Sequence, residues 1–295
     1  MKTLLGVSRV SFLLLTPACV LLGLGVAVWE TGSVNWLYFV LALIGALSAH
    51  ISVNAFNEYF DFRSGLDTRT ERTPFSGGSG TLPENPAEAR KALLWGWFTL
   101  AVTAAVGVFF LAVRGWGLLP LGVAGVALVY LYTVWVTKNP LASLIAPGLG
   151  FGTFMVMGTH YALTGHYSWS AFWASLVPFF LVNDLLLLNQ FPDVEADRTV
   201  GRKNYPILLG RAKAARLYVA FLALAYLSII AGVALGFLPA WSLLGLLTLV
   251  LAVPTAQKAL RYADDLPNLM PALGNNVLIN LLTPVLMAIG LWLAK

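Results

Sequence analysis

Long apolar runs dominate this chain of 295 residues, and they set what it can fold into. Each run is close to the ~20 residues that a helix needs to cross the hydrocarbon core of a bilayer, where backbone groups must be satisfied internally. The runs fall at about 9–29, 34–57, 91–113, 117–137, 141–163, 168–190, 214–236, 239–257 and 272–293. They predict an all-α fold: a polytopic transmembrane bundle of about nine helices in which residues 1–295 form a single integral membrane domain.

Composition supports a lipid environment. The chain is 59% hydrophobic and 11% charged, whereas a soluble domain is about a quarter charged. The net charge of +5 does not indicate nucleic acid as a partner, because the basic residues lie in the connections between apolar runs.

The distribution of Lys and Arg predicts the orientation of the bundle. If nine helices alternate, 16 basic residues fall on one side and only Arg114 and Lys295 on the other. By the positive-inside rule the N-terminus and the basic side are cytoplasmic. We therefore expect a multi-pass protein of a prokaryotic inner membrane with a cavity that opens to the cytoplasm. The two long basic connections expected at about 58–90 and 190–213 concentrate function on that side.

Two similar polar clusters stand where the second and sixth apolar runs end. The first is Asn57-x-x-x-Asp61 followed by Asp67, and the second is Asn189, Asp193 and Asp197. A spacing of four residues places Asn and Asp one turn apart on the same helix face. Asp67 lies beyond Gly65, where we expect the helix to end and the chain to fold back. Pro192 is expected to kink the second cluster.

These side chains are hard oxygen ligands of the kind that Mg²⁺ binds together with water and substrate phosphates. An acid inside a membrane helix costs about 2.5–3.5 kcal/mol on insertion scales, so the clusters need positive partners. One alternative is that the four aspartates simply pair with Arg63, Arg69, Arg198 and Arg202. The repetition of the Asn-and-Asp pattern favours a pair of metal sites. We predict Asp61, Asp67, Asp193 and Asp197 as catalytic residues, and these four with Asn57 and Asn189 as metal ligands.

Basic residues near the clusters could hold the oxygens of a diphosphate as its carbon–oxygen bond breaks. The predicted diphosphate-binding residues are Arg9, Arg72, Lys138, Arg198, Arg202 and Lys203. Each of them is also explained as an ordinary positive-inside anchor. Arg202 and Lys203 are the strongest candidates because they closely follow Asp197.

The two clusters and their positions give the chain a clear family resemblance. Over nearly its full length it resembles the UbiA superfamily of intramembrane aromatic prenyltransferases, whose Asp-rich motifs follow the second and sixth helices. The segment from Asn189 to Arg198, followed by Gly201-Arg-Lys-Asn204, is typical of that superfamily. The five residues between Asp61 and Asp67 resemble the 1,4-dihydroxy-2-naphthoate branch, as does the stretch from Gly148 to Tyr161. Tyr132 to Pro140 departs from a motif common in that branch, which leaves the acceptor open.

The resemblance implies Mg²⁺-dependent transfer of a polyprenyl chain from its diphosphate to an aromatic acceptor. In the naphthoate branch the acceptor loses CO₂, as a step of menaquinone biosynthesis. His160 and Asp184 lie within apolar runs, and we predict them as acceptor-pocket or supporting residues. A packed, hydrogen-bonded histidine is the alternative for His160.

Other readings stay open. The enzyme could prenylate a different acceptor. An ion-coupled transporter would also explain membrane acids and a fifth run broken by Pro147, Gly148, Gly150 and Gly152. Against the transporter, the acids gather at one membrane face instead of at the midplane.

Overall fold

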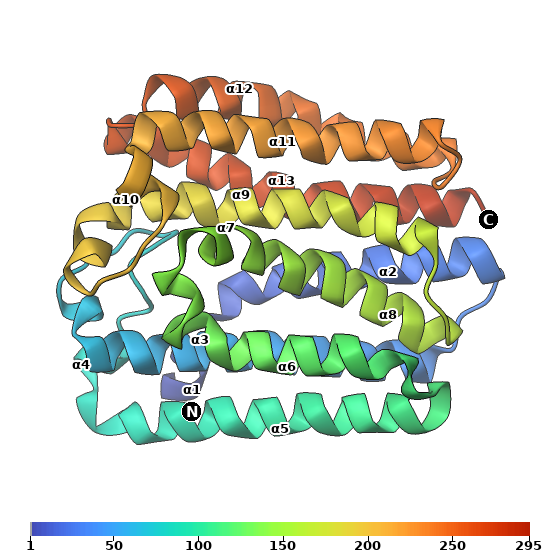
Figure 1. Cartoon of the computed structure of the whole chain (residues 1–295), viewed down its shortest axis with the longest axis horizontal. Coiled ribbons are helices and arrows are strands. Elements are labelled where there is room, and N and C mark those ends of the chain that lie inside the picture. The colour runs from blue at the N-terminus through green and yellow to red at the C-terminus, as the bar shows by residue number, and fades with distance from the viewer. Residues whose placement is uncertain (1) are drawn as a thin grey trace.

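Residues 2–295 of the computed structural model form long helices that lie side by side along one axis (Figure 1). Within this part of the chain, nine helical segments are long and apolar enough to cross a membrane. They are Val10–Thr31, Trp36–Ser64, Pro86–Arg114, Trp116–Val134, Pro140–Thr164, Trp169–Thr199, Arg211–Ala234, Ala240–Arg261 and Leu266–Leu293. No strand occurs between residues 2 and 295, so the predicted all-α class and helix number are confirmed.

The nine segments contain the following elements. The α-helices are α2 (Leu15–Thr31), α3 (Trp36–Ser64), α5 (Ala89–Arg114), α6 (Leu119–Val134), α7 (Pro140–Gly148), α8 (Met155–Thr164), α9 (Trp169–Thr199), α11 (Arg211–Ala234), α12 (Leu249–Arg261) and α13 (Leu266–Leu293). Tighter or wider turns precede or interrupt some of them: η1 (Val10–Leu14), η3 (Pro86–Glu88), η4 (Trp116–Leu118), the π-helical η6 (Leu149–Phe154) and η7 (Ala240–Thr248). Short elements between them are α1 (Lys2–Val7), η2 (Leu66–Thr68), α4 (Thr81–Glu84), η5 (Val136–Lys138) and α10 (Tyr205–Leu209).

Three helices extend beyond the apolar runs that predict them. Helix α3 continues to Ser64 and α9 to Thr199, past the ends of these runs at about 57 and 190, so both polar clusters lie largely on helices, as their spacing predicts. Helix α13 begins at Leu266 instead of residue 272. Hydropathy marks where a helix leaves lipid, but its backbone hydrogen bonds continue into water until a capping residue stops them.

Helix α9 lies at the centre of the packing. Its neighbours include α7, α11 and α13, and its fully buried Leu181, Leu188 and Phe191 join Tyr218 of α11 in the main apolar core. By contrast, α5 and α6 expose large apolar side chains, among them Val108 at 64% and Val123 at 61%. Water would not tolerate such a continuous apolar surface. The chain is an integral, multi-pass membrane protein.

The fifth membrane segment is broken into α7, η6 and α8, and two glycines explain how closely it packs. A Cβ at Gly148 would lie 2.1 Å from the carbonyl oxygen of Phe179, and a Cβ at Gly152 would lie 2.3 Å from the amide nitrogen of Phe179. Asn183 of α9 accepts a hydrogen bond from the Gly148 N–H at 2.6 Å. This contact holds the irregular segment against α9, where it forms one wall of a large cavity.

Candidate active site

The first polar cluster is assembled from the end of α3 and the turn that follows. Asn57 and Asp61 lie one turn apart on α3, and the Asn57 amide donates to Thr133 Oγ1 of α6 at 3.3 Å. Gly65 ends the helix with φ of +78°, a conformation that glycine adopts without strain. Element η2 then returns the chain so that Asp67 faces the same cavity as Asp61. The predicted fold-back after Gly65 is confirmed.

The second cluster lies on one uninterrupted helix. Asn189, Asp193 and Asp197 follow one face of α9, which contains Pro192 and still continues to Thr199. All three side chains line the cavity opposite the first cluster. We call the end of the bundle that carries both clusters the carboxylate end; it lies on the left of Figure 1, near α4 and α10.

Arg202 joins the two clusters. Its Nη2 pairs with Asp61 and its Nη1 donates to Asp197 Oδ1 at 3.0 Å. Asn204 donates to the other Asp197 oxygen at 3.1 Å. Burial works against the charge on Arg202, but the carboxylates of Asp61 and Asp197 outweigh it and raise its pKa. Pairing with an arginine, the alternative to metal binding, therefore applies to one aspartate of each cluster, Asp61 and Asp197.

The other carboxylate of each cluster keeps an acceptor without a partner. Within residues 2–295, Asp67 Oδ2, Asn189 Oδ1 and Asp193 Oδ1 are buried and receive no hydrogen bond. Burial, followed by the charges of Asp61 and Glu58, raises the pKa of Asp67 to about 7. Buried acceptors without donors are rare in folded proteins. Oxygen atoms of carboxylate and amide groups around one cavity fit divalent cations such as Mg²⁺.

The glycine-rich loop Gly77–Gly80 packs against the first cluster, and Glu58 holds the loop in place. The buried Glu58 carboxylate accepts hydrogen bonds from the Ser79 N–H at 2.8 Å, the Ser79 hydroxyl at 2.6 Å and Arg9 Nε at 2.6 Å. Gly78, at φ of +73°, lies so close that a Cβ there would be 2.9 Å from Asp67 Oδ1. Glu58 was not predicted from the sequence, because the helix period turns it away from the face of Asn57 and Asp61. The feature that could have identified Glu58 is an acidic residue at the end of a membrane helix with no expected partner.

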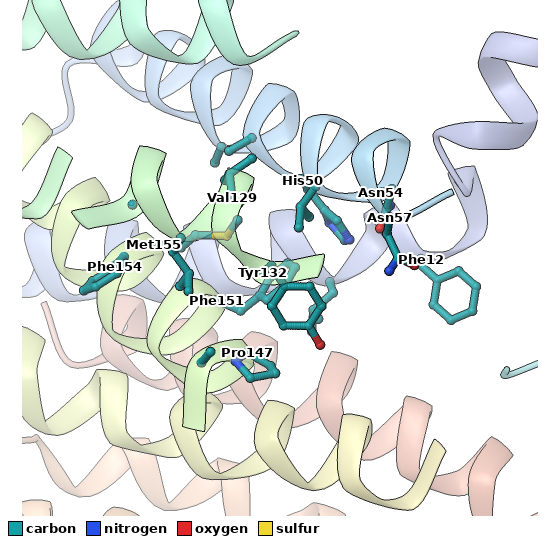
Figure 2. Close-up of a pocket in the computed structure, with 18 of the residues that line it drawn as sticks. Phe12, His50, Asn54, Asn57, Val129, Tyr132, Pro147, Phe151, Phe154 and Met155 are labelled. Carbon is teal, nitrogen blue, oxygen red and sulfur yellow. The ribbon is translucent and has the colours of Figure 1, made fainter. Parts of the chain in front are cut away.

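The cavity itself has a volume of about 860 Å³ and is mostly apolar away from the clusters. Its walls come from α3, α5, α6, the broken fifth segment, α9 and α13. Figure 2 shows His50, Asn54 and Asn57 on one side of the pocket and Val129, Phe154 and Met155 on the other. The site thus combines a polar mouth, lined by carboxylates and two arginines, with an apolar interior. This combination suits a substrate that has a hydrocarbon tail and an anionic head bound through a cation.

Comparison with known proteins shows which family has this architecture. The model of the UbiA prenyltransferase family matches residues 16–270. The chain belongs to this family. It is 28% identical over 278 residues to a 1,4-dihydroxy-2-naphthoate octaprenyltransferase of Bacillus subtilis, covering 92% of this chain and 86% of that protein. The similarity makes this UbiA-family protein a prenyltransferase, not a transporter.

Solved structures share the fold. The apo structure of a UbiA homolog from Aeropyrum pernix aligns with a TM-score of 0.72 at 19% identity, covering 95% of this chain and 96% of that one. A UbiA homolog from Archaeoglobus fulgidus bound to GPP and Mg²⁺ aligns with a TM-score of 0.66 at 15% identity, covering 98% and 99%.

The predicted bases separate into two groups in this UbiA-family enzyme. Among residues 2–295, the cavity lining includes Arg9 and Arg202 but not the other four predicted bases. Arg72 pairs with Glu84 at 3.0 Å and Arg198 pairs with Glu195 at 3.3 Å, both at exposed positions. The remaining two, Lys138 and Lys203, lie in the connections that follow α6 and α9. Tyr132 and Asn204, which the sequence analysis did not select, do line the cavity.

The two predicted acceptor-pocket residues lie apart from each other. Asp184 is fully buried in α9, and neither of its carboxylate oxygens has a partner within residues 2–295. Its backbone carbonyl accepts from Asn276 of α13 at 3.4 Å. His160 is also fully buried but faces Glu30 near the end of α2, which is the end of the bundle opposite the carboxylate end. His160 is thus a packed, hydrogen-bonded histidine, which was the alternative prediction for it.

Proposed function

We propose that this enzyme transfers a polyprenyl chain from its diphosphate to 1,4-dihydroxy-2-naphthoate, with loss of CO₂, in menaquinone biosynthesis. One structural observation supports the reaction type. Two polar clusters meet at the mouth of an apolar cavity, and several of their buried oxygen acceptors have no partner in the part of the chain that the structure describes. The acceptor rests on the naphthoate prenyltransferase from Bacillus subtilis, which resembles most of the chain. Mg²⁺ is proposed because the related UbiA homolog was solved with GPP and Mg²⁺.

The residues at the mouth would bind the diphosphate head. Asp67, Asn189 and Asp193 would hold Mg²⁺ through their free oxygens, with Asp61 and Asp197 close by. When bound, Mg²⁺ supplies positive charge that stabilises the leaving diphosphate. Arg202 and Arg9 line the same mouth, and their guanidinium groups can donate to phosphate oxygens. Gly77 and Gly78 of the glycine-rich loop also line the cavity, and backbone N–H groups of such loops can bind phosphate oxygens.

The apolar interior would hold the prenyl chain and exclude water from the reactive carbon. When the bond between C1 of the prenyl group and the diphosphate oxygen breaks, the electron pair leaves with the diphosphate and an allylic cation remains. Aromatic faces stabilise such a cation by roughly 0.5–2 kcal/mol each. Tyr132 and Phe151 both line the cavity (Figure 2), and we propose them for this role.

The acceptor then supplies the electrons for the new bond. The ring carbon that carries the carboxylate attacks C1 of the cation, and a carbon–carbon bond forms. The bond to the carboxylate breaks, CO₂ departs, and its electron pair restores the aromatic ring. In this sequence the attacking ring carbon releases CO₂ instead of a proton, so the step requires no catalytic base at that carbon.

The membrane orientation belongs to the same proposal. The positive-inside distribution supports a cytoplasmic carboxylate end and a cytoplasmic N-terminus in a prokaryotic inner membrane. Water-soluble diphosphate and naphthoate heads would then reach the clusters from the cytoplasm, while the chain stays in lipid. We further propose that residues 1–295 act as one catalytic domain.

The test is an assay of the purified protein in detergent with labelled prenyl diphosphate, Mg²⁺ and a panel of aromatic acceptors. The naphthoate should give product with release of one CO₂ per transfer, and EDTA should abolish it. Asp61→Ala and Asp193→Ala should each lower kcat/KM by at least about 100-fold. The first leaves Arg202 without one of its partners, and the second removes an oxygen proposed to hold Mg²⁺. Asp264→Ala is the matched control, since Asp264 is exposed and lies outside the cavity lining.

The outcomes separate the parts of the proposal. Product from another acceptor, with the same dependence on Asp193, would keep the reaction and overturn the naphthoate assignment. Normal turnover by Asp61→Ala and Asp193→Ala would overturn the site.

A further inference from the structure

A second group of metal-binding side chains lies at the end of the bundle opposite the carboxylate end. Glu30 is near the end of α2, His160 is in α8, and His166 follows α8 in the connection to α9. These three residues each offer a ligand atom, and the three atoms lie within 4.8 Å of one another. Two of the three histidines of the chain therefore meet one carboxylate at a single place that the prenyl transfer does not use.

The backbone turns sharply to bring His166 to this place. Gly165 ends α8 with φ of +85°, and the His166 N–H lies 3.4 Å from Thr164 Oγ1. The rings of His160 and His166 consequently stand nearly perpendicular, at 88°, with centroids 5.5 Å apart. A hydrogen bond between Glu30 and His160 would not need the second imidazole. The chain nevertheless brings His166 back toward Glu30 and His160. This arrangement is the observation that points to a ligand.

The outer nitrogen of His160, Nε2, faces the cluster, with Ser168 Oγ 3.4 Å away. Nε2 lies 2.7 Å from Glu30 Oε2. Thr164 Oγ1 lies 3.4 Å from Nδ1 and can accept the proton of that nitrogen. Metal-bound histidines commonly use their second nitrogen in this way, which fixes the ring and the tautomer. Because His160 is fully buried and Glu30 and His166 reach the surface, an ion could enter from the outside.

The donor set selects the class of metal. Two imidazole nitrogens and one carboxylate oxygen suit Zn²⁺ and similar transition metals, whereas Mg²⁺ prefers oxygen ligands. Three protein ligands with a fourth position open to water are a common zinc arrangement. The ion at this place should therefore differ in kind from the one at the carboxylate end.

We propose that Glu30, His160 and His166 form a transition-metal site of the Zn²⁺ class. It fastens the end of α2 to α8 and to the start of the α8–α9 connection. Thr159 and Ala162, the neighbours of His160 in α8, line the catalytic cavity. A bound ion would thus stiffen the wall of the cavity farthest from the diphosphate site.

The experiment uses the full-length protein in detergent, purified without a histidine tag and stripped with EDTA. Zn²⁺ is titrated against a chromophoric chelator in excess Mg²⁺, which occupies the oxygen sites. The wild type should bind one tight Zn²⁺ per chain, and so should Asp67→Asn/Asp193→Asn. His166→Ala and Glu30→Gln should each weaken that binding by at least about 100-fold, beyond the usual effect of losing a supporting residue. Glu88→Gln, which removes a partly exposed carboxylate paired with Lys91, is the matched control.

Two further measurements keep folding and binding separate. Co²⁺ should give a visible absorption spectrum in the wild type that is absent from His166→Ala. Zn²⁺ should raise the Tm of the wild type, since an ion that binds only the folded state stabilises it, and should leave the Tm of His166→Ala unchanged. If His166→Ala has a lowered Tm without metal, Glu30→Gln decides in its place. Absence of tight Zn²⁺ binding in the wild type, or its retention in both variants, would overturn the proposal.

Discussion

The two polar clusters have the same order of residues but are built differently. The first combines the end of α3 with a separate turn after Gly65, and a glycine-rich loop packs on it. The second lies on α9 alone, in one stripe that passes Pro192. A continuous helix fixes spacing by itself, whereas a broken one needs a loop to hold its last ligand in place.

The clusters also divide their charges in the same way. Arg202 pairs with Asp61 of the first cluster and Asp197 of the second. Asp67 and Asp193 each have a buried oxygen that finds no partner among residues 2–295. One arginine thus locks the two halves together and leaves the other pair available to a cation. Arg202 therefore holds the two clusters together and also supplies positive charge within the site.

The largest effect in this comparison should come from Arg202→Gln. The change leaves Asp61 and Asp197 buried without their shared cation, and removal of one partner of a buried ion pair typically destabilises by about 3–5 kcal/mol. We expect kcat/KM to fall by at least about 100-fold, as for the loss of a donor to developing charge. Denaturation in detergent and the prenyl-transfer assay measure the two effects.

Arg202→Lys provides the control for charge. A lysine keeps the positive charge but lacks the planar fork that can reach two carboxylates at once. It should recover stability more than activity. Full activity in Arg202→Lys would show that bridging the clusters is unnecessary.

Gly78→Ala should have an intermediate effect, confined to the first cluster. The new Cβ would lie 2.9 Å from Asp67 Oδ1, at a backbone φ of +73°. Strain at positive φ costs roughly 1 kcal/mol, and the contact should move the loop away from Asp67. We expect about a tenfold rise in the Mg²⁺ concentration needed for half-maximal activity.

Gly236→Ala separates strain from contact. Gly236 has φ of +79°, close to that of Gly78, but no atom of residues 2–295 lies within 4 Å of a Cβ there, so this variant carries strain and no clash. It should lose stability without a change in Mg²⁺ requirement. An equal change in both variants would mean that the loop does not support Asp67.

The sequence predicted much of this site because its spacing rules are local. The helix period places Asn57 with Asp61 and aligns Asn189 with Asp193 and Asp197, and the structure shows these alignments. The partners of each acid are set by packing between elements far apart in the sequence. Arg202 reaches Asp61 across 141 residues and Arg9 reaches Glu58 across 49, and no local pattern encodes either pairing. The same holds for Glu30 and His160, which are 130 residues apart.

Arg198→Gln should have the smallest effect, although Arg198 is only four residues from Arg202. Its side chain is 57% exposed and pairs with Glu195, which is 72% exposed, and such surface pairs contribute about 0–1 kcal/mol. We expect stability within about 0.5 kcal/mol of the wild type, as for most surface substitutions, and kcat/KM reduced by less than about threefold. The same two assays apply. A loss as large as that of Arg202→Gln, with unchanged stability, would show that Arg198 turns into the cavity when the diphosphate binds. The division of bases into cavity and surface groups would then hold only for the protein without substrate.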